Sequence, residues 1–155
     1  MTIVIGSDHG GFRLKSEIIR WLEQKSIEYM DVGAWDTNSV DYPDIAFAAA
    51  QLILNGQCEK GILVCGSGIG IGIAANKISG IRAALCHDVY SAQKSREHND
   101  ANILTLGERV IGVGHALAVV EEWLSTDFDG GRHERRIEKS ADLEKKNEEM
   151  GHFRK

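Results

Sequence analysis

The sequence predicts an α/β fold in which a five-stranded parallel sheet is covered by helices on both faces. Short apolar runs alternate with helix-length segments five times along the 155 residues, so that each strand is followed by a helix. The runs are apolar at nearly every position, which is typical of strands that are buried on both faces. Glycine and polar residues follow the ends of several runs, where ligands bind in folds of this kind.

The first half of the chain supplies three strands and two helices. A β-branched run ends in a glycine turn, after which Leu14, Ile18 and Leu22 recur at helical spacing. The only proline, Pro43, suits the first turn of the second helix, and Gly56 ends that helix. We expect strands at 3–5, 28–32 and 61–65, a first helix that ends near residue 25, and a second helix over 43–56.

The second half continues the same alternation. A glycine loop follows the third strand, and Ala116, Val120 and Leu124 mark the apolar face of the fifth helix. We expect strands at 81–85 and 103–106, helices that end near 77 and 96, and a charged helical tail from about 132.

Length and composition limit the classes of protein to which this chain can belong. The chain is long enough for one domain with a real core, and we treat residues 1–155 as a single domain. Its 43% hydrophobic and 26% charged residues are ordinary for a soluble globular protein. The net charge of −5 argues against a general nucleic-acid binder. No apolar run approaches the roughly 20 residues of a membrane span.

The cysteines and the N-terminus indicate an intracellular, cytoplasmic protein. The three cysteines, Cys58, Cys65 and Cys86, are odd in number and widely spaced, without a CxxC pair or a metal-ligand spacing. Reduced thiols in an intracellular protein fit this pattern best. The first residues lack the basic start and the full apolar stretch of a signal peptide.

One stretch stands out as a candidate site. Cys65 ends the third strand, and Gly66, Gly68, Gly70 and Gly72 follow at alternate positions before a helical segment. Glycines let the backbone turn tightly and approach a ligand closely. Free amides and the positive end of the helix dipole favour an anion there, and they favour the thiolate form of a cysteine. The stretch therefore offers an acid/base or nucleophilic cysteine beside a cradle for negative charge.

The same stretch has three other possible interpretations. A phosphatase loop needs an arginine six residues after its cysteine, and Ile71 stands there, which excludes that class. Residues 70–75 fit the dinucleotide pattern G-x-G-x-x-A, with Asp88 eighteen residues on, but in the third strand–helix unit instead of the first. A buried cysteine followed by a structural turn remains the simplest alternative.

Polar side chains also follow other strands. Asp8 and His9 follow the first strand and Arg109 the fifth, so they should share the carboxyl edge of the sheet with the glycine loop. Taken alone, an Asp-His pair in a loop is more often a turn and a cap than a site. His98 and Asn99 lie between a helix and the fifth strand, and they should start at the opposite edge unless they serve another subunit.

The tail begins with a basic cluster in a chain that is otherwise acidic. Arg132 and Arg136 share one helical face at i, i+4, and two guanidinium groups on one face suit a phosphate. Taken alone, the cluster is better explained as a solvated face that pairs with Glu134 and Glu138. Together, the residues indicate a small α/β enzyme for an anionic substrate, with an acid/base cysteine and no evident metal.

A set of motifs goes further, because together they resemble the type B ribose-5-phosphate isomerases. That family also includes galactose-6-phosphate and allose-6-phosphate isomerases. The resemblance covers nearly the whole chain, in order and at the expected spacing, and the set is more specific than any one motif. The motifs are Ser7-Asp8-His9-Gly10-Gly11, Cys65-Gly66-Ser67-Gly68-Ile69-Gly70, Asn76-Lys77, Gly80-Ile81-Arg82-Ala83-Ala84, His98-Asn99-Asp100-Ala101-Asn102 and Gly130-Gly131-Arg132-His133.

The resemblance implies aldose–ketose isomerisation of ribose 5-phosphate and ribulose 5-phosphate through a cis-enediolate, without a cofactor. Cys65 matches the base that takes the proton beside the carbonyl, and Ile71 stands where other members carry a glutamate. Ser67 matches a residue that helps to move protons between the sugar oxygens, and His98 matches the residue that opens the sugar ring. The other matching positions bind substrate: Asp8, His9, Tyr42, Gly66, Gly68, Ile69, Gly70, Asn99, Arg109, Arg132 and Arg136.

The resemblance also implies a particular assembly. It places the strands in a Rossmann-like three-layer α/β/α sandwich. In this family the site forms between the two subunits of a homodimer, which would let residues from opposite edges meet. The tail, about 130–155, would pack on the partner subunit, and dimers can pair into tetramers. The pathway implied is the non-oxidative branch of the pentose phosphate pathway; a six-carbon sugar phosphate stays open as the alternative substrate.

Overall fold

The sheet is parallel throughout and has β3 at its centre. The computed structural model describes residues 1–151, so the last four residues of the expected tail lie outside the described residues. The strands are β1 (Thr2–Ser7), β2 (Glu28–Asp31), β3 (Lys60–Cys65), β4 (Ala83–Leu85) and β5 (Ile103–Gly107). They lie in the order β2-β1-β3-β5-β4, and every neighbouring pair is parallel. The predicted fold class is confirmed.

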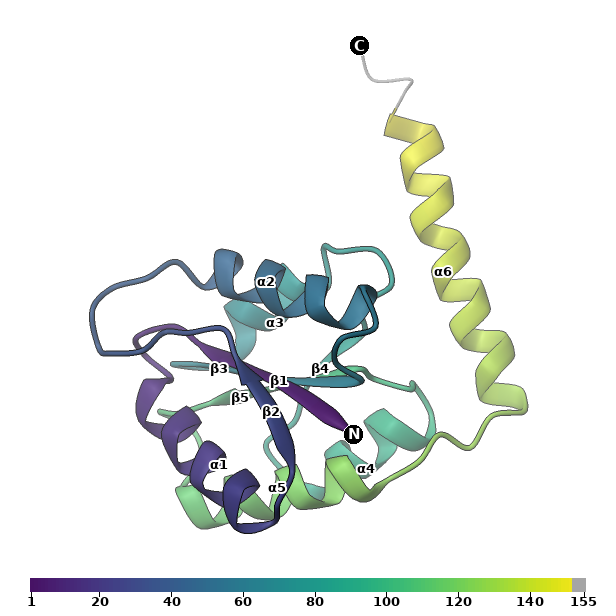
Figure 1. Cartoon of the computed structure of the whole chain (residues 1–155). Coiled ribbons are helices and arrows are strands. Elements are labelled where there is room, and N and C mark those ends of the chain that lie inside the picture. Colours follow the sequence, from purple (N-terminus) through teal and green to yellow (C-terminus); the bar gives the residue numbers. More distant parts are fainter. Residues whose placement is uncertain (152–155) are drawn as a thin grey trace.

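Helices cover both faces of this sheet and form a three-layer sandwich (Figure 1). On one face, α1, α4 and α5 pack around the buried Trp123, while α2 and α3 pack on the other face around Ala49 and Ile71. These two clusters are the core. The helices are α1 (Phe12–Gln24), α2 (Tyr42–Leu54), α3 (Ile69–Ala75), α4 (Val89–Glu97), α5 (Val113–Ser125) and α6 (Arg132–Gly151).

The predicted apolar positions bury as expected. Leu14, Ile18 and Leu22 of α1 all lie in the core, and Pro43 lies in the first turn of α2. Every residue of β5 is buried, as are the last five residues of β3, because helices cover both of their faces. The edge strand β2 is instead partly exposed along its length.

Predicted boundaries differ from the observed ones by up to two residues: β1 runs to Ser7 instead of residue 5, and α2 ends at Leu54 instead of residue 56. The two errors around the fourth strand have the same cause. The third helix ends at Ala75 instead of near residue 77, and β4 begins at Ala83 instead of residue 81. The Asn76 side chain accepts from the Ala83 N–H at 2.8 Å and donates to its carbonyl at 2.9 Å. The segment between them is therefore a turn, held by an amide that imitates a neighbouring strand.

The helix α6 extends beyond the sandwich (Figure 1), and Glu144 on it accepts a hydrogen bond from the Ser79 hydroxyl. Leu143 and Met150 on this helix are exposed. Between residues 1 and 151, no helix combines the length and the apolar character that crossing a membrane requires.

Candidate active site

Cys65 is the last residue of β3, and its thiol faces the glycine loop. The side chain is buried, and its Sγ accepts the backbone N–H of Gly68 at 3.1 Å. Gly68 has φ +78°, and a Cβ there would lie 2.5 Å from Leu85 Cδ1 and 2.8 Å from the carbonyl carbon of Leu106. Only glycine can make this turn, and the turn aims an amide donor at the sulfur.

The turn after β1 lies directly against this loop. The buried Asp8 accepts the Gly10 N–H at 2.8 Å, and a Cβ at Gly10 would lie 3.2 Å from the Gly66 nitrogen. At Gly11 a Cβ would lie 2.5 Å from the carbonyl carbon and oxygen of Val64. Because the backbones approach so closely, a carboxylate is held beside the cysteine loop with one oxygen already bonded.

The segment after β5 closes the other side of the loop. The N–H of Glu108 donates to the Cys65 carbonyl at 2.9 Å, and that of Arg109 donates to the Gly66 carbonyl at 3.0 Å. The Arg109 guanidinium lies 3.5 Å from where a Gly66 Cβ would be. A permanent positive charge therefore covers the start of the glycine loop.

Three further predicted residues border the same loop more loosely. His9 is exposed, and its Nδ1 accepts the Val40 N–H at 3.4 Å, a long bond. The Tyr42 ring lies 3.0 Å from where a Gly70 Cβ would be. Ser67 Oγ accepts the N–H of Ile69 at 3.3 Å.

The remaining predicted residues gather at the opposite, amino edge of the sheet. The His98 ring stacks on that of His133, with centroids 4.3 Å apart and planes 6° apart. A pocket of about 250 Å³ joins these rings to Asn99 and Arg136. Burial lowers the pKa of His133, and His98, Arg132 and Arg136 lower it further. A neutral imidazole therefore lies against His98, beside two guanidinium groups.

A single chain thus presents the predicted site residues in two separate groups, which we call half-sites. One half, at the carboxyl edge, is Asp8, His9, Tyr42, Cys65, Gly66, Ser67, Gly68, Ile69, Gly70 and Arg109. The other half, at the amino edge, is His98, Asn99, Arg132 and Arg136. Since α4 starts beyond the end of β4 and runs back along the sheet, His98 is expected at the far end from Cys65.

The amino-edge half-site also contains one group with metal-binding residue types. Donor atoms of His98, Asp129 and His133 lie within 4.8 Å of one another. The two rings are stacked and nearly parallel, however, so their in-plane lone pairs cannot converge on one ion without a rotation of a ring. The arrangement suits two stacked imidazoles better than two metal ligands.

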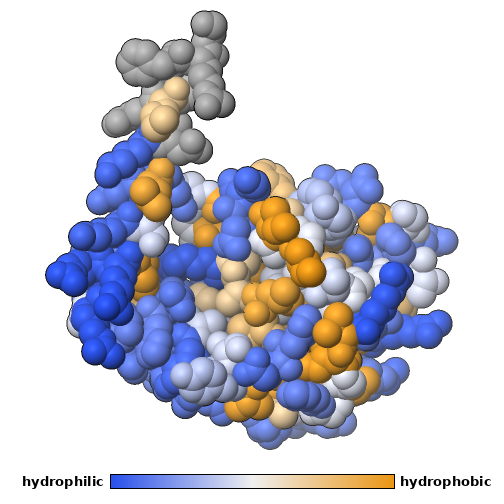
Figure 2. Space-filling model, turned by 180° about the vertical axis from the view of Figure 1, so that it is seen from behind, coloured by the Kyte–Doolittle hydropathy of each residue, from blue (hydrophilic) through white to orange (hydrophobic). Residues whose placement is uncertain are grey.

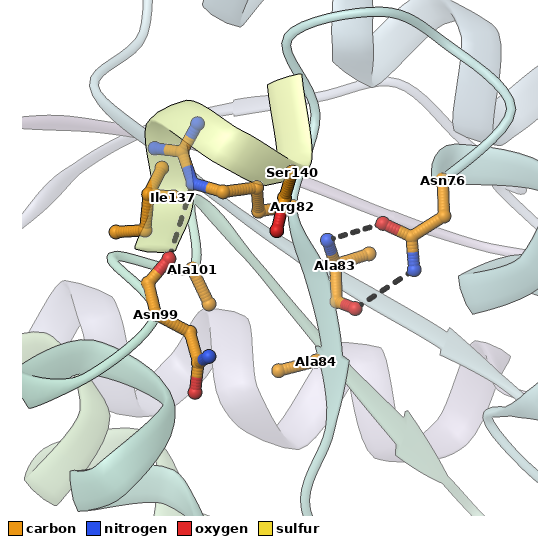
Figure 3. A pocket seen from close by; sticks show the side chains of 8 residues that line it. All are labelled: Asn76, Arg82, Ala83, Ala84, Asn99, Ala101, Ile137 and Ser140. Atoms are coloured by element: carbon orange, nitrogen blue, oxygen red, sulfur yellow. Dashed lines mark hydrogen bonds between the residues drawn. The ribbon is translucent and has the colours of Figure 1, made fainter. Parts of the chain in front are cut away.

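The loop that follows α4 is held by two arginines, and the bond from Arg82, just before β4, to Asn99 is drawn in Figure 3. Arg82 Nε donates to the Asn99 carbonyl at 3.1 Å, and its terminal nitrogen bonds to the Asp100 carboxylate at 3.1 Å. Arg96 donates to the same carboxylate at 2.8 Å. Arg82 belongs to a motif of the sequence, and its part in the structure is to clamp this loop.

Sequence reasoning missed two buried or half-buried residues near the carboxyl edge. Lys15 is 1% exposed, and its Nζ lies 2.7 Å from both oxygens of Asp31 and 2.6 Å from the Ala34 carbonyl. His87 accepts the N–H of Gly107 through Nε2 at 3.0 Å. The position of His87 directly after the fourth strand was the available signal, but nothing local in the sequence marks Lys15.

Comparison with known proteins identifies the family. The model of the Ribose/Galactose Isomerase family matches residues 3–140. Ribose-5-phosphate isomerase B of Escherichia coli (strain K12) is 45% identical over 144 residues, which cover 93% of this chain and 97% of that protein. D-erythrulose-4-phosphate isomerase of Pectobacterium atrosepticum is 43% identical over 140 residues, 90% of this chain and 92% of that one. The solved structure of Clostridium thermocellum ribose-5-phosphate isomerase B superposes with a TM-score of 0.94 at 52% identity, covering 95% of this chain and 99% of that one. The chain therefore belongs to the ribose/galactose isomerase family and is an isomerase.

Proposed function

We propose that the protein interconverts ribose 5-phosphate and ribulose 5-phosphate through a cis-enediolate, with Cys65 as the base and without a metal or a cofactor. The observation that carries this proposal is the Cys65 thiol, buried at the end of the central strand and bonded to the Gly68 amide at 3.1 Å. Family membership supplies the reaction class, and a relative named ribose-5-phosphate isomerase B supports the substrate. The setting would be the cytoplasm and the non-oxidative pentose phosphate pathway.

The chemistry at the carboxyl edge is a sequence of three proton transfers. The Cys65 thiolate takes the proton from C2 of the open-chain aldose, and the electron pair moves through the new C1–C2 double bond to the C1 oxygen. The amides between Gly66 and Gly70 stabilise that oxyanion, which is commonly the largest catalytic contribution. Ser67 helps to move a proton from the C2 oxygen to the C1 oxygen. The thiol then returns its proton to C1, which gives the ketose and restores the thiolate.

The groups at the amino edge complete the site from a second copy of the chain. His98 opens the sugar ring as acid and base, with Asn99 beside it. Arg132 and Arg136 of that copy bind the phosphate together with His9 and Arg109 of the first, while Asp8 and Tyr42 hold the sugar. The proposal therefore requires at least a homodimer, with the tail of each subunit on its partner and an active site between them; pairing of dimers into tetramers stays open.

Two features support a second copy. Apolar side chains gather on the face of the molecule seen in Figure 2. Among the exposed apolar residues, Ile69 and Ile73 of α3, Leu85 of β4 and Val89 of α4 are each at least 40% exposed. Contiguous exposed apolar surface commonly marks an interaction site. The projecting α6 begins at Arg132 and exposes apolar side chains of its own, which suits a helix that packs on another molecule.

The test of the cysteine is a pair of alanine variants. Purified protein treated with a chelator should interconvert the two sugar phosphates, and Cys65→Ala should lose about 10²–10⁴-fold in kcat. Cys58→Ala is the matched control, because Cys58 is also buried but lies before β3, away from the loop. Full activity in Cys65→Ala would overturn the thiol base, and an inactive wild-type protein would overturn the substrate.

A six-carbon aldose phosphate is the second candidate substrate, because the family is named for galactose as well as ribose. Comparing kcat/KM for ribose 5-phosphate, allose 6-phosphate, galactose 6-phosphate and erythrulose 4-phosphate separates these alternatives. Preference for ribose 5-phosphate supports the proposal. A dinucleotide-binding module, suggested by residues 70–75, is the remote alternative, and calorimetry with NAD(H) and NADP(H) would expose it through saturable micromolar binding.

A further inference from the structure

At the edge of the sheet beside the candidate site, just beyond the end of β4, the His87 side chain accepts a backbone hydrogen bond from β5. The last backbone bond from β4 to β5 is Cys86 N–H to the Thr105 carbonyl at 3.3 Å. The next donor, the N–H of Gly107, is bonded to Nε2 of His87 at 3.0 Å. Because Nε2 accepts this bond, it must carry the lone pair, so the imidazole is neutral with its proton on Nδ1.

Gly107 links this imidazole to the cysteine loop. It is buried and pairs with Cys65 in the register of β3 and β5. A Cβ on Gly107 would lie 2.6 Å from the carbonyl carbon and oxygen of Ser67, so the strand end is pressed against the loop. The two residues after Gly107 donate to the carbonyls of Cys65 and Gly66, and the second of them is Arg109.

We propose that His87 is a positioning residue for the isomerase reaction. Its neutral ring accepts the hydrogen bond of the Gly107 amide and so fixes the end of β5. The segment that follows Gly107 then places the Arg109 guanidinium over Gly66. Protonation at Nε2 turns the acceptor into a donor that faces the Gly107 N–H, which releases this hold and makes it sensitive to acid. The functional part of this inference rests on the proposed function, in which Arg109 binds the phosphate.

Few charged groups bear on the ring. Burial lowers the pKa of His87, His115 of α5 lowers it further, and the neighbouring Asp88 raises it. The Glu108 carboxylate is engaged elsewhere, since it accepts the Leu14 N–H at 2.9 Å. His87 is therefore neutral at pH 7, and the contact with Gly107 is lost only in a more acidic medium.

The test compares two substitutions at one position. His87→Leu removes the acceptor and should raise KM for ribose 5-phosphate roughly three- to tenfold, with a smaller change in kcat. His87→Gln can present an amide oxygen near the place of Nε2 without titrating, and it should restore KM to about the wild-type value at pH 7.5. His115→Gln is the control, because it changes a neighbouring charge but leaves the bond to Gly107 intact.

The pH dependence distinguishes positioning from simple packing. The ratio of wild-type KM to the KM of His87→Gln should rise as pH falls from 7.5 to 5.5, because only the wild-type residue protonates. The ionisation of the substrate phosphate cancels in this ratio. A flat ratio, an unchanged KM in His87→Leu, or a failure of His87→Gln to rescue would each overturn the inference.

A spectroscopic measurement keeps the contact testable even if His87→Leu does not fold. In the wild-type protein, the ¹H–¹⁵N signal of Gly107 should shift with pH together with the His87 ring signals. Independent titration of the two would overturn the inference. Absence of isomerase activity in the wild-type protein would overturn the proposed function alone, since the Gly107 signal needs no substrate.

Discussion

The carboxyl and amino edges of the sheet hold their half-sites in different ways. At the carboxyl edge, close backbone contacts at Gly11, Gly68 and Gly107 fix the loops around Cys65. At the amino edge, the loop that carries His98 is fixed by side chains, chiefly the bonds of Arg82. The first arrangement leaves no room for a Cβ, whereas the second depends on the reach of flexible side chains.

Because of this difference, the two half-sites tolerate different kinds of substitution. The backbone contacts at the carboxyl edge are possible only because glycine has no Cβ. Any larger residue at these positions therefore damages both the fold and the site. Contact through side chains is graded, so a substitution there can weaken one step of the reaction while the fold survives. Three measurements test this contrast.

The largest effect is expected from Gly11→Ala. The new Cβ would lie 2.5 Å from the Val64 backbone, so β3 or the turn after β1 must shift. We expect the free energy of unfolding to fall by about 3 kcal/mol in urea denaturation, as overpacking does in cores. Activity should fall with it, because the same shift moves Cys65.

Gly114→Ala is the control for that experiment. Gly114 lies in the first turn of α5, and a Cβ there would meet nothing within 4 Å. Alanine should be neutral or stabilise the protein by roughly 0.5 kcal/mol, because it loses less backbone entropy than glycine. Equal destabilisation by both variants would show that the close contacts at the carboxyl edge are not decisive.

A smaller and more selective effect is expected from Arg82→Met, which keeps the aliphatic stem but removes the bonds to residues 99 and 100. We expect a loss of about 1–2 kcal/mol in stability, since Arg82 is partly exposed. Misplacement of His98 should slow the conversion of ribose 5-phosphate about tenfold. Exchange of the C1 hydrogen of ribulose 5-phosphate with D₂O should change less, because it needs Cys65 but no ring opening. An equal fall in both rates would contradict the assignment of His98 to ring opening.

The smallest effect is the contribution of one histidine at each edge to the pH dependence of stability. Burial is the main cause that lowers the pKa of both His87 and His133. The unfolded chain binds their protons more readily, so stability that is present above about pH 6.5 is lost as pH falls through the lower, folded pKa. His87→Gln and His133→Gln should each reduce the loss of unfolding free energy between pH 7.5 and pH 5.5. An unchanged loss in both variants would contradict this account.

Much of the fold could be predicted because the signals are local. Apolar runs and helical periodicity, such as Leu14-Ile18-Leu22, depend on burial that a parallel sheet imposes on every strand. The order of strand and helix then placed Asp8, Cys65 and Arg109 at one edge. The same order places His98 at the other edge.

Long-range pairs could not be predicted in the same way. Lys15 lies between two core positions of α1, and a lysine there is expected to reach solvent. It is buried because Asp31, sixteen residues away at the end of β2, meets it at 2.7 Å. The stacking of His98 on His133 likewise joins α4 to α6, and no spacing in the sequence records that contact.

The bond between Asn76 and Ala83 has a consequence for the protein at high concentration. The edge strand β4 has only three residues, and the outward N–H and C=O of the first are taken by an amide from the chain itself. Unpaired edges are templates on which other molecules add strands and begin to aggregate. Because the Asn76 side chain occupies the backbone groups of Ala83, a foreign strand finds fewer free hydrogen-bonding groups along this edge.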